Sequence, residues 1–400
     1  MNKTKEQLID AILDRGVIKE IIPGKKEFKE KLLNSKLKIY IGADPTSSAL
    51  HLSHAKNYML LEEFRQLGHE VIILFGDFTA RIGDPTDKVA VRKQLSRKEV
   101  LDNVKGWLDQ IKPLIDFGDK KNPPKIVYNH DWLAKLTMED VVNLASNVTV
   151  QQMLERDMFA KRLEEKKPIF LHEFLYPIMQ GYDSVAMEVD VELCGTDQIF
   201  NALVGRTLLK KLKDKDKFVV AVNLMENPVT GELMSKSRGT GVFLNSSPAD
   251  MFGAIMSQPD EMIKIFLINN TRLSLSEVEK IVKMENPKDA KMLTALEITK
   301  IFHGEEEAQK AKEYFVNTFS KRETPEEINE LKVDKEKMAI TEFLVLAGLA
   351  DSKSDARRKI EQGGVAMNGK KVIDWQLFLD KKNNDAVLKV GKFGFVKIKF

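Results

Sequence analysis

The sequence predicts an α/β protein with a parallel sheet in its N-terminal half, followed by an all-helical region and a small mixed unit. Short apolar runs alternate with amphipathic stretches up to about residue 222, which is the pattern of βαβ units. A helical pattern then extends over residues 247–324, and the pair Asn368-Gly369 predicts a tight turn near the C-terminus. The expected strands of the sheet are 38–41, 71–74, 125–128 and 218–222.

Composition limits the class of protein before any motif is considered. The chain has 400 residues, of which 43% are hydrophobic, enough for a sizeable core and for two or three domains. Charged residues make up 31% and the formal net charge is only +3, which is typical of a soluble protein and excludes a disordered acidic chain. No stretch approaches the ~20 apolar residues of a membrane span, and residues 1–10 lack the apolar run of a signal peptide. We therefore expect neither secretion nor membrane insertion.

Cysteine usage and the distribution of charge indicate the compartment and the kind of partner. Cys194 is the single cysteine, so no internal disulfide can form, and we expect a reducing, cytoplasmic location. Residues 351–400 carry 12 Lys and Arg against 6 Asp and Glu, a net charge of +6, so the rest of the chain carries −3. A nucleic-acid backbone is therefore expected to contact the C-terminal segment.

Changes of pattern divide the chain into parts. Ser247 followed by Pro248 is typical of a helix start, and the residue before Pro325 is biased away from helix, so a helical domain is expected between them. The residues after Pro325 are dense in charge and predict a linker, and two helices are expected beyond it at 338–349 and 354–361. The expected division is a first domain over 1–246, a helical domain over 247–324, a linker over 325–337 and a last unit over 338–400.

Two histidines follow the first expected strand. Ser47 and Ser48 can cap the helix that comes next, and His51 and His54, three residues apart, then share a face near its N-terminus. The free backbone N–H groups and the positive dipole at that end suit a phosphate. The alternative is a pair of ordinary polar histidines at a helix start. Small Ser53 lies between them and would let a flat base approach the backbone, which favours the phosphate site.

Two further segments carry cations in loops. Residues 231–241 hold Lys236 and Arg238 among three glycines and two serines, which predicts a mobile cationic loop suited to a polyphosphate. Another loop after the second strand ends in Lys88, and Arg92 would share the face of Lys88 on a following helix. The alternatives are a solvated basic loop in the first case and a plain Asp-Pro turn before a charged helix in the second.

A polar stripe is expected on a helix in the middle of the chain. Tyr176, Gln180 and Asp183 stand at positions i, i+4 and i+7, which share one face of a helix. A phenol, an amide and a carboxylate together are unusual on a core face. Either the stripe faces solvent, or it forms the floor of a pocket that binds an amino acid.

Basic side chains cluster in the last unit, around the tight turn between expected strands 365–367 and 372–374. Such clusters bind a phosphate backbone through charge, although a solvated basic helix is the alternative. The basic residues are Arg357, Arg358 and Lys359 on the second expected helix, with Lys370 and Lys371 after the turn.

Taken together, these segments are similar to the two sequence marks of the class I aminoacyl-tRNA synthetases, here His51-Leu52-Ser53-His54 and Met234-Ser235-Lys236-Ser237. The lead-in Tyr40-Ile41-Gly42-Ala43-Asp44-Pro45-Thr46 resembles the bacterial-type enzymes for tyrosine, and the resemblance covers nearly the whole chain. It implies a Rossmann-like catalytic domain, a helical anticodon-binding domain and a small α+β RNA-binding domain of the αL-motif type. It also implies the reaction of a tyrosine–tRNA ligase, in which tyrosine and ATP give tyrosyl-adenylate before the tyrosyl group passes to tRNA.

The resemblance assigns roles to individual residues. Contacts to the ATP phosphates in the transition state are implied for Thr46, His51 and His54, and neutralisation of the leaving pyrophosphate for Lys88, Arg92 and Lys236. The nucleotide site is implied at Gly42, Asp44, Ser53, Gly195, Asp197, Gln198, Met234, Ser235 and Ser237, with Asp197 on the ribose. The tyrosine site is implied at Tyr40 and Asp183 for the phenol, at Asp84, Tyr176 and Gln180 for the α-ammonium group, and at Gln198.

Partners follow from the same resemblance. ATP would enter as a substrate with Mg²⁺, and neither a permanently bound cofactor nor a protein metal site is expected. The acceptor would be tRNA(Tyr), and no membrane partner is expected. A homodimer is implied, formed through an insertion at about residues 120–167.

Three positions depart from the family pattern. Leu233 replaces the first lysine of the cationic loop, Ser53 stands where glycine is usual, and Ala43 is smaller than the usual aromatic residue. A related nucleotidyltransferase, or an RNA-binding protein that kept the fold without catalysis, would be the competing function. An enzyme for tryptophan is the nearest relative within the family, and the phenol-binding pair Tyr40 and Asp183 argues against it.

Overall fold

The computed structural model describes residues 3–83, 95–234, 241–320, 328, 330–333, 335–350, 352–391 and 394–400, apart from the side chains of residues 157, 319 and 320. The chain forms two compact units, Met1–Ala308 and Gln309–Phe400. Among the described residues, no helix is both long enough and apolar enough to cross a bilayer.

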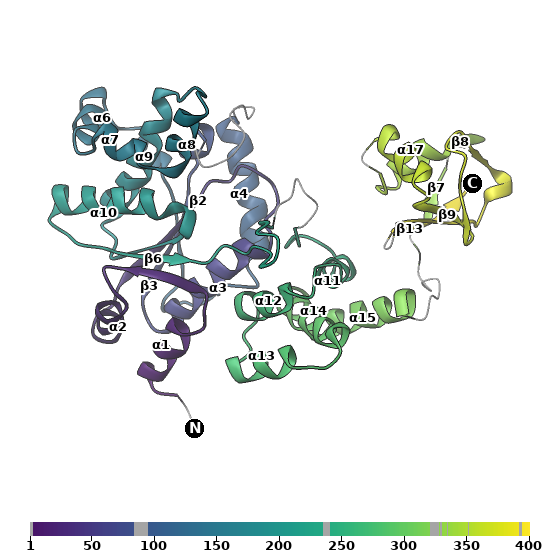
Figure 1. Cartoon of the computed structure of the whole chain (residues 1–400), viewed down its shortest axis with the longest axis horizontal. Helices are drawn as coiled ribbons and strands as arrows, with labels where there is room; N and C mark the ends of the chain where they lie inside the picture. The colour runs from purple at the N-terminus through teal and green to yellow at the C-terminus, as the bar shows by residue number, and fades with distance from the viewer. Residues whose placement is uncertain are drawn as a thin grey trace. The chain divides into compact units, whose positions relative to one another are not determined.

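The first unit is built around a six-stranded sheet in the order β1-β6-β5-β2-β3-β4. Strands β2, β3 and β6 of this sheet are labelled in Figure 1. All neighbouring strands are parallel except β1, which pairs antiparallel with β6. The chain leaves β2 through β3 to β4 and then returns to the other side of β2 with β5 and β6. The strands are β1 (Ile18–Ile22), β2 (Lys38–Ala43), β3 (Glu70–Phe75), β4 (Lys125–Tyr128), β5 (Val191–Gly195) and β6 (Phe218–Val222).

Apolar side chains explain why these segments form the centre of the sheet. Ile39, Ile73, Val191 and Val219 come from four adjacent strands and are completely buried. Parallel strands are covered on both faces, so their sequences are apolar runs rather than alternating patterns. The four strands expected at 38–41, 71–74, 125–128 and 218–222 are confirmed to within two residues at either end.

Helices connect the strands, and α9 and α10 lie side by side against the sheet (Figure 1). Several begin at a capping box: Ser96 Oγ accepts the Glu99 N–H at 3.3 Å, and the Glu99 carboxylate accepts the Ser96 N–H at 2.8 Å. The helices are α1 (Lys5–Leu13), α2 (Lys25–Asn34), α3 (Leu52–Gln66), α4 (Arg97–Ile111), α5 (His130–Leu133), α6 (Met138–Ala145), α7 (Val150–Leu154), α8 (Asp157–Glu164), α9 (Leu171–Met187) and α10 (Ile199–Lys213).

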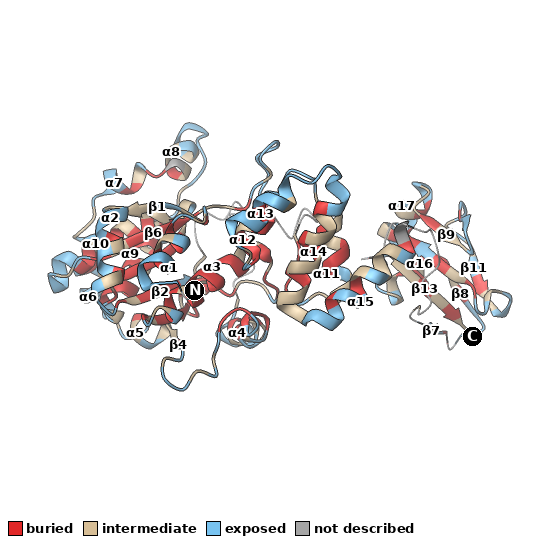
Figure 2. Cartoon of the chain, turned by 90° about the horizontal axis from the view of Figure 1, so that it is seen from below, coloured by how far each residue is buried: buried red, intermediate tan, exposed pale blue. Residues whose placement is uncertain are grey.

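A helical region follows the sheet, as the sequence predicts. It comprises α11 (Pro248–Met256), α12 (Met262–Asn270), α13 (Leu275–Val282), α14 (Pro287–His303) and α15 (Glu305–Phe315). Figure 2 shows buried residues on the inner faces of α11, α12 and α14. Asn270 is fully buried and donates to the Leu52 carbonyl at 2.8 Å, while the Arg15 guanidinium donates to the Thr271 carbonyl at 2.6 Å. These bonds fasten the helical region to the start of α3 and to the end of α1.

The C-terminal unit contains a five-stranded sheet in the order β10-β9-β12-β13-β7 and a two-stranded sheet β11-β8. Its core includes the fully buried Ile340, Phe343, Leu388 and Ile398. The elements are β7 (Glu330–Lys332), β8 (Lys337–Ala339), α16 (Ile340–Leu346), α17 (Lys353–Glu361), β9 (Val365–Met367), β10 (Lys370–Lys371), β11 (Phe378–Asp380), β12 (Val387–Val390) and β13 (Gly394–Lys399).

The expected tight turn is confirmed, because Asn368 and Gly369 have φ of 48° and 79° between antiparallel β9 and β10. The strand expected at 372–374 is wrong, since the hairpin strand is Lys370–Lys371 and the Asp374 side chain accepts the Gln376 N–H at 2.8 Å to form a turn. The expected linker at 325–337 contains β7, which pairs in parallel with β13.

The cap expected for the helix after β2 is also wrong. Helix α3 begins at Leu52 with His51 as its N-cap, and not after Ser47 or Ser48. The Leu244 N–H donates to the Leu50 carbonyl at 2.9 Å, and the Leu52 N–H donates to the Val242 carbonyl at 3.0 Å. This pairing with a distant segment holds the chain extended as far as His51, which local sequence cannot reveal.

Candidate active site

The site begins at Asp44, which directly follows β2. Its Oδ1 accepts the Thr79 hydroxyl at 2.6 Å, and its Oδ2 accepts the Tyr176 hydroxyl of α9 at 2.8 Å. Gly76 makes room for this contact, because a Cβ there would lie 1.9 Å from Asp44 Oδ1. Two residues that the sequence assigned separately, to the nucleotide site and to the tyrosine site, are therefore hydrogen-bonded to each other.

A buried carboxylate lies two turns further along α9. Asp183 is 2% exposed and accepts the Trp132 indole N–H at 2.7 Å and the Asn129 side-chain N–H at 3.3 Å. Asn129 also donates to Thr79 Oγ1 at 3.0 Å, which joins Asp183 to the Asp44 group. Burial raises the pKa of Asp183 well above its ordinary value, against the opposing effect of the two donors.

The phenol of Tyr40 on β2 is buried, and its hydroxyl lies 3.0 Å from Ser184 Oγ on α9. Burial raises its pKa well above 10, and the nearby Glu192 and Asp183 carboxylates add to the rise, so the hydroxyl keeps its proton at neutral pH. Gln180 is half-buried on the same helix and donates to Glu192 Oε1 at 3.0 Å.

The stripe Tyr176, Gln180 and Asp183 therefore faces inward rather than toward solvent. Tyr176 and Asp183 are both buried, and Gln180 accepts the Asn201 side-chain N–H at 2.9 Å. Tyr40 is not directly bonded to Asp183, because its bond goes to Ser184.

The two histidines lie together at the start of α3. Their ring centroids are 4.0 Å apart, and the His51 backbone N–H donates to His54 Nδ1 at 3.2 Å. Burial lowers the pKa of His51 to about 4, helped by the charge of Lys56, and lowers that of His54 well below its usual range. Both rings are thus neutral at pH 7. His51 Nδ1 is buried and has no hydrogen-bond partner among the described residues.

The segment that follows the cationic loop lies against the histidine pair. His51 forms an isolated antiparallel bridge with Phe243, just after the cationic loop. On the other side of the loop, Met234 is buried and its N–H donates to the Met225 carbonyl at 3.1 Å. The two ends of the loop are therefore fixed in the first unit. Six assigned residues lie outside the described residues: Asp84, Lys88, Arg92, Ser235, Lys236 and Ser237.

The end of β5 completes the site. Gln198 Nε2 donates to Asp197 Oδ2 at 3.1 Å, and Asn201 donates to Gln198 Oε1 at 2.9 Å. Asp197 is exposed, and a Cβ on Gly195 would lie 2.3 Å from Asp197 Oδ1. Since Asn201 also bonds Gln180, the end of β5 is connected to the stripe on α9.

The remaining assigned residues lie along the same edge. Gly42 is exposed near the end of β2, and the Thr46 N–H donates to the Asp44 carbonyl at 2.8 Å in the turn that follows. Ser53 is half-buried in the first turn of α3, and Ala43 is the last residue of β2. Leu233, at the position of the missing lysine, is 43% exposed.

Sequence reasoning missed several side chains of the site. Lys56 on α3 is 2% exposed, and its ammonium donates to Asn57 Oδ1 at 3.0 Å. Burial lowers the pKa of Lys56 to about 8, while the Asp197 carboxylate acts in the opposite direction. Its polar neighbours His54 and Asn57 give no sequence signal of burial, whereas Glu192, between Val191 and Leu193, is an ionisable residue inside an apolar run and could have been found. The further missed residues are Thr79, Asn129, Trp132, Ser184, Glu192 and Lys217.

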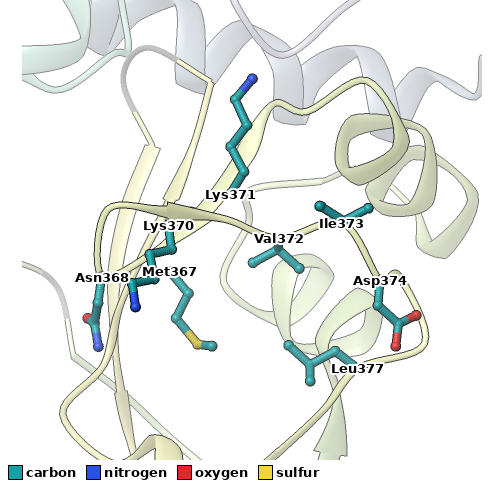
Figure 3. Close-up of a pocket in the computed structure, with 8 residues that line it drawn as sticks. All are labelled: Met367, Asn368, Lys370, Lys371, Val372, Ile373, Asp374 and Leu377. Carbon is teal, nitrogen blue, oxygen red and sulfur yellow. The ribbon is translucent and has the colours of Figure 1, made fainter.

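The basic residues of the C-terminal unit fall into two groups. On α17, the Arg357 guanidinium stacks 4.3 Å above the Trp375 ring, and Asp355 pairs with both Arg358 and Lys359. Lys370 and Lys371 are exposed on β10. In Figure 3 the Lys371 side chain extends away from a pocket on this surface. The pocket is lined by Met367, Asn368, Lys370, Lys371, Val372, Ile373, Asp374 and Leu377.

Comparison with known proteins covers both units. Residues 31–320 match the model of the class I tRNA synthetases (W and Y), and residues 321–393 match the SYY-like C-terminal domain of tyrosine–tRNA ligase. A tyrosine–tRNA ligase of Carboxydothermus hydrogenoformans is 43% identical over 100% of this chain and 99% of its own. One from Thermotoga maritima is 41% identical over 97% of this chain and 96% of its own.

Solved structures agree on the fold. A C-terminally truncated mitochondrial tyrosyl-tRNA synthetase of Aspergillus nidulans has a TM-score of 0.66 at 21% identity, covering 78% of this chain and 94% of that one. The tyrosyl-tRNA synthetase of Archaeoglobus fulgidus, solved with L-tyrosine, has a TM-score of 0.59 at 18% identity. The match covers 77% of this chain and 100% of that one. With the family models and the curated relatives, the chain belongs to the class I tRNA synthetases and, within them, to the bacterial tyrosine–tRNA ligases.

Proposed function

We propose that this chain is a tyrosine–tRNA ligase that makes tyrosyl-adenylate at the carboxyl edge of its sheet. The observation that carries the proposal is the inward-facing polar group Tyr40, Tyr176, Gln180 and Asp183, of which Gln180 alone is only half-buried, in the same unit as the paired histidines. An amino acid with a phenol at one end fits such a polar group. The neutral histidines lie where the helix dipole of α3 favours phosphate.

The phenol end of the pocket supplies selectivity. Asp183 can accept a hydrogen bond from a substrate hydroxyl, and the protonated Tyr40 can donate one. Phenylalanine has no hydroxyl to form these two additional hydrogen bonds, and each buried bond left unmade costs about 1–3 kcal/mol. The α-ammonium group would be held by Tyr176 and Gln180, together with Asp84, which lies outside the described residues.

The first reaction is a displacement at phosphorus. A tyrosine carboxylate oxygen bonds to the α-phosphorus of ATP, the bond to the β-phosphate oxygen breaks, and pyrophosphate leaves. No covalent enzyme intermediate forms, so catalysis consists of positioning and charge stabilisation. Thr46, His51 and His54 would donate to the phosphates, and Lys88, Arg92 and Lys236 would neutralise the pyrophosphate. Mg²⁺ would enter with ATP as part of the substrate.

The nucleotide would lie across the switch point between β2 and β5. Its ribose would bind the exposed Asp197 carboxylate, and its base would approach the backbone at Ser53. The remaining assigned contacts are Gly42, Asp44, Gly195, Gln198, Met234, Ser235 and Ser237. In the second reaction a ribose hydroxyl of the 3′-terminal adenosine of tRNA(Tyr) attacks the tyrosyl carbonyl, and AMP leaves.

The parts of the chain would divide this work. Residues 1–246 would make the adenylate, residues 247–324 would read the anticodon, and residues 338–400 would hold the tRNA backbone, with 325–337 connecting them. The lone Cys194 is buried and unpaired, which suits the reducing cytoplasm where translation takes place.

A homodimer is part of the proposal. Large apolar side chains are exposed between β4 and the first turn of α9, where Met138 and Leu171 are each 79% exposed. Exposed apolar patches of this kind mark protein–protein contacts. Figure 2 shows how much of α6 is exposed. The exposed apolar residues are Met138, Val142, Val150, Leu163, Phe170 and Leu171.

Exchange of labelled pyrophosphate into ATP tests the first reaction. We expect exchange that depends on tyrosine and that neither tryptophan nor phenylalanine supports at equal concentration, since only a phenol satisfies Tyr40 and Asp183. Exchange with tryptophan and not with tyrosine would overturn the choice of substrate. No exchange with any of the three would overturn adenylate formation itself.

Sedimentation velocity tests the dimer. The wild-type protein is expected to sediment with twice its 45.5 kDa chain mass. The double variant Met138→Glu with Leu171→Glu is expected to sediment with the mass of a single chain, because a dimer would have to bury the two new carboxylates in its interface. Ile373→Glu is the matched control, since Ile373 is 85% exposed in the other unit and its variant should stay dimeric. A wild-type protein of single-chain mass at micromolar concentration would contradict the proposal.

Salt-dependent binding of tRNA(Tyr) tests the C-terminal unit. Lys370→Ala with Lys371→Ala is expected to weaken affinity and to reduce the slope of log affinity against log salt by about one to two, because each phosphate contact releases a counterion. Lys381→Ala with Lys382→Ala removes the same charge from another exposed part of the unit. Equal losses in the two double variants would show that net charge, and not this surface, binds the RNA.

A further inference from the structure

We propose that Lys217, Glu192 and Ser184 form a buried polar support that positions Tyr40 and Gln180, and so sets the preference of the pocket for a phenol. The inference rests on the tyrosine site proposed above and names positioning residues for it. None of the three is one of the residues that the family resemblance assigns to substrate.

The support is a closed set of contacts behind the pocket. Lys217, just before β6, is 1% exposed, and its ammonium donates to Ser184 Oγ at 2.6 Å and to the Glu192 carboxylate. Glu192, on β5, is 2% exposed. Each partner of the lysine then holds one pocket residue: Ser184 lies 3.0 Å from the Tyr40 hydroxyl, and Glu192 accepts the Gln180 amide at 3.0 Å.

Two glycines make the space that this support needs. A Cβ on Gly205 of α10 would lie 2.7 Å from the Lys217 Nζ and 3.1 Å from Ser184 Oγ. A Cβ on Gly181 of α9 would lie 3.2 Å from the Gly205 Cα. The two helices therefore approach backbone to backbone, and the ammonium occupies the room that a side chain on Gly205 would take.

The direction of the hydrogen bonds gives the support its function. An ammonium group only donates, so Ser184 Oγ must accept from Lys217. The Ser184 hydroxyl hydrogen can then point to the Tyr40 oxygen at 3.0 Å, which is closer than the Glu192 oxygen at 3.4 Å. Tyr40 thus accepts from Ser184, and its own hydrogen can go to a ligand hydroxyl in competition with the nearby Glu192 carboxylate.

The pocket then offers a donor and an acceptor together. Tyr40 supplies the donor and Asp183 supplies the acceptor, and a phenol hydroxyl needs one of each. The Lys217 ammonium also lies 5.9 Å from the centre of the Tyr40 ring, where its attraction to the ring helps to fix the ring. A buried ion pair is often no more stabilising than apolar residues of the same size, which fits a role in orientation rather than in stability.

The test compares variants in the tyrosine-dependent pyrophosphate exchange assay. Removing one charge alone would leave the other buried and unpaired, so the main variant is Lys217→Met with Glu192→Gln, which keeps an acceptor for Gln180. We expect the KM for tyrosine to rise, and the ratio of kcat/KM for tyrosine over phenylalanine to fall, each about tenfold or more. The KM for ATP should stay within about twofold. Ser184→Ala leaves the charge unchanged and is also expected to lower the ratio of kcat/KM for tyrosine over phenylalanine.

The control is a second buried ion pair in the same unit. Glu62 and Arg65 on α3 are 4% and 6% exposed and bond each other at 2.6 Å, and their other side-chain hydrogen bonds among the described residues go to Gln66, Asp116, Asp119 and Asn122. Glu62→Gln with Arg65→Met should lower thermal stability without changing the KM for tyrosine. Unchanged selectivity in both Ser184→Ala and the Lys217 double variant, with the wild type active, would overturn this inference alone. A wild type inactive with tyrosine would overturn the proposed function as well.

Discussion

The order of the strands reverses between β2 and β5, and the position of every group in the candidate site depends on this reversal. The two strands are parallel neighbours, and the chain leaves their carboxyl ends in opposite directions, toward α3 and toward α10. Asp44 and the histidine pair therefore follow the end of β2, and Asp197 follows the end of β5. Helix α9 precedes β5, and its Tyr176 hydroxyl donates to Asp44.

The amino-acid part of the site consists of buried or half-buried polar groups, and Asp44, Asp183, Gln180 and Tyr40 each have a hydrogen-bond partner. Buried polar groups are costly unless they are hydrogen-bonded, so a pocket of this kind is stable only as a connected network. Asp44 and Asp183 are joined through Thr79 and Asn129, and Gln180 is joined to the end of β5 through Asn201. A substrate that completes the network is favoured, and one that leaves a group unpaired is rejected.

The strands that sequence predicts well are those that a local run of apolar residues identifies. β2, β3, β4 and β6 are apolar runs bounded by polar residues, which is the usual sequence pattern of strands in a parallel sheet. β5 was missed because Glu192 interrupts its apolar run, and that carboxylate is buried only because Lys217 meets it from the neighbouring segment. Likewise, the start of α3 depends on Val242 and Leu244, some 190 residues further along the chain.

In the site, too, some features can be predicted from local sequence and others depend on distant segments. The inward stripe on α9 follows from helical spacing, and the histidine pair follows from its place after a strand. The partners that set its chemistry come from distant segments: Trp132 for Asp183, and Ser184 for Tyr40. Spacing along one element identifies which residues share a face, but not which residue on another element will bond them.

A crystal structure of the full chain with tyrosine and a non-hydrolysable ATP analogue would show where both substrates bind. We expect the substrate phenol between Tyr40 and Asp183, its amino group near Tyr176 and Gln180, and the nucleotide between His51 and Asp197. Tyrosine bound with its ring away from Asp183, or a nucleotide outside the opening between β2 and β5, would contradict this arrangement.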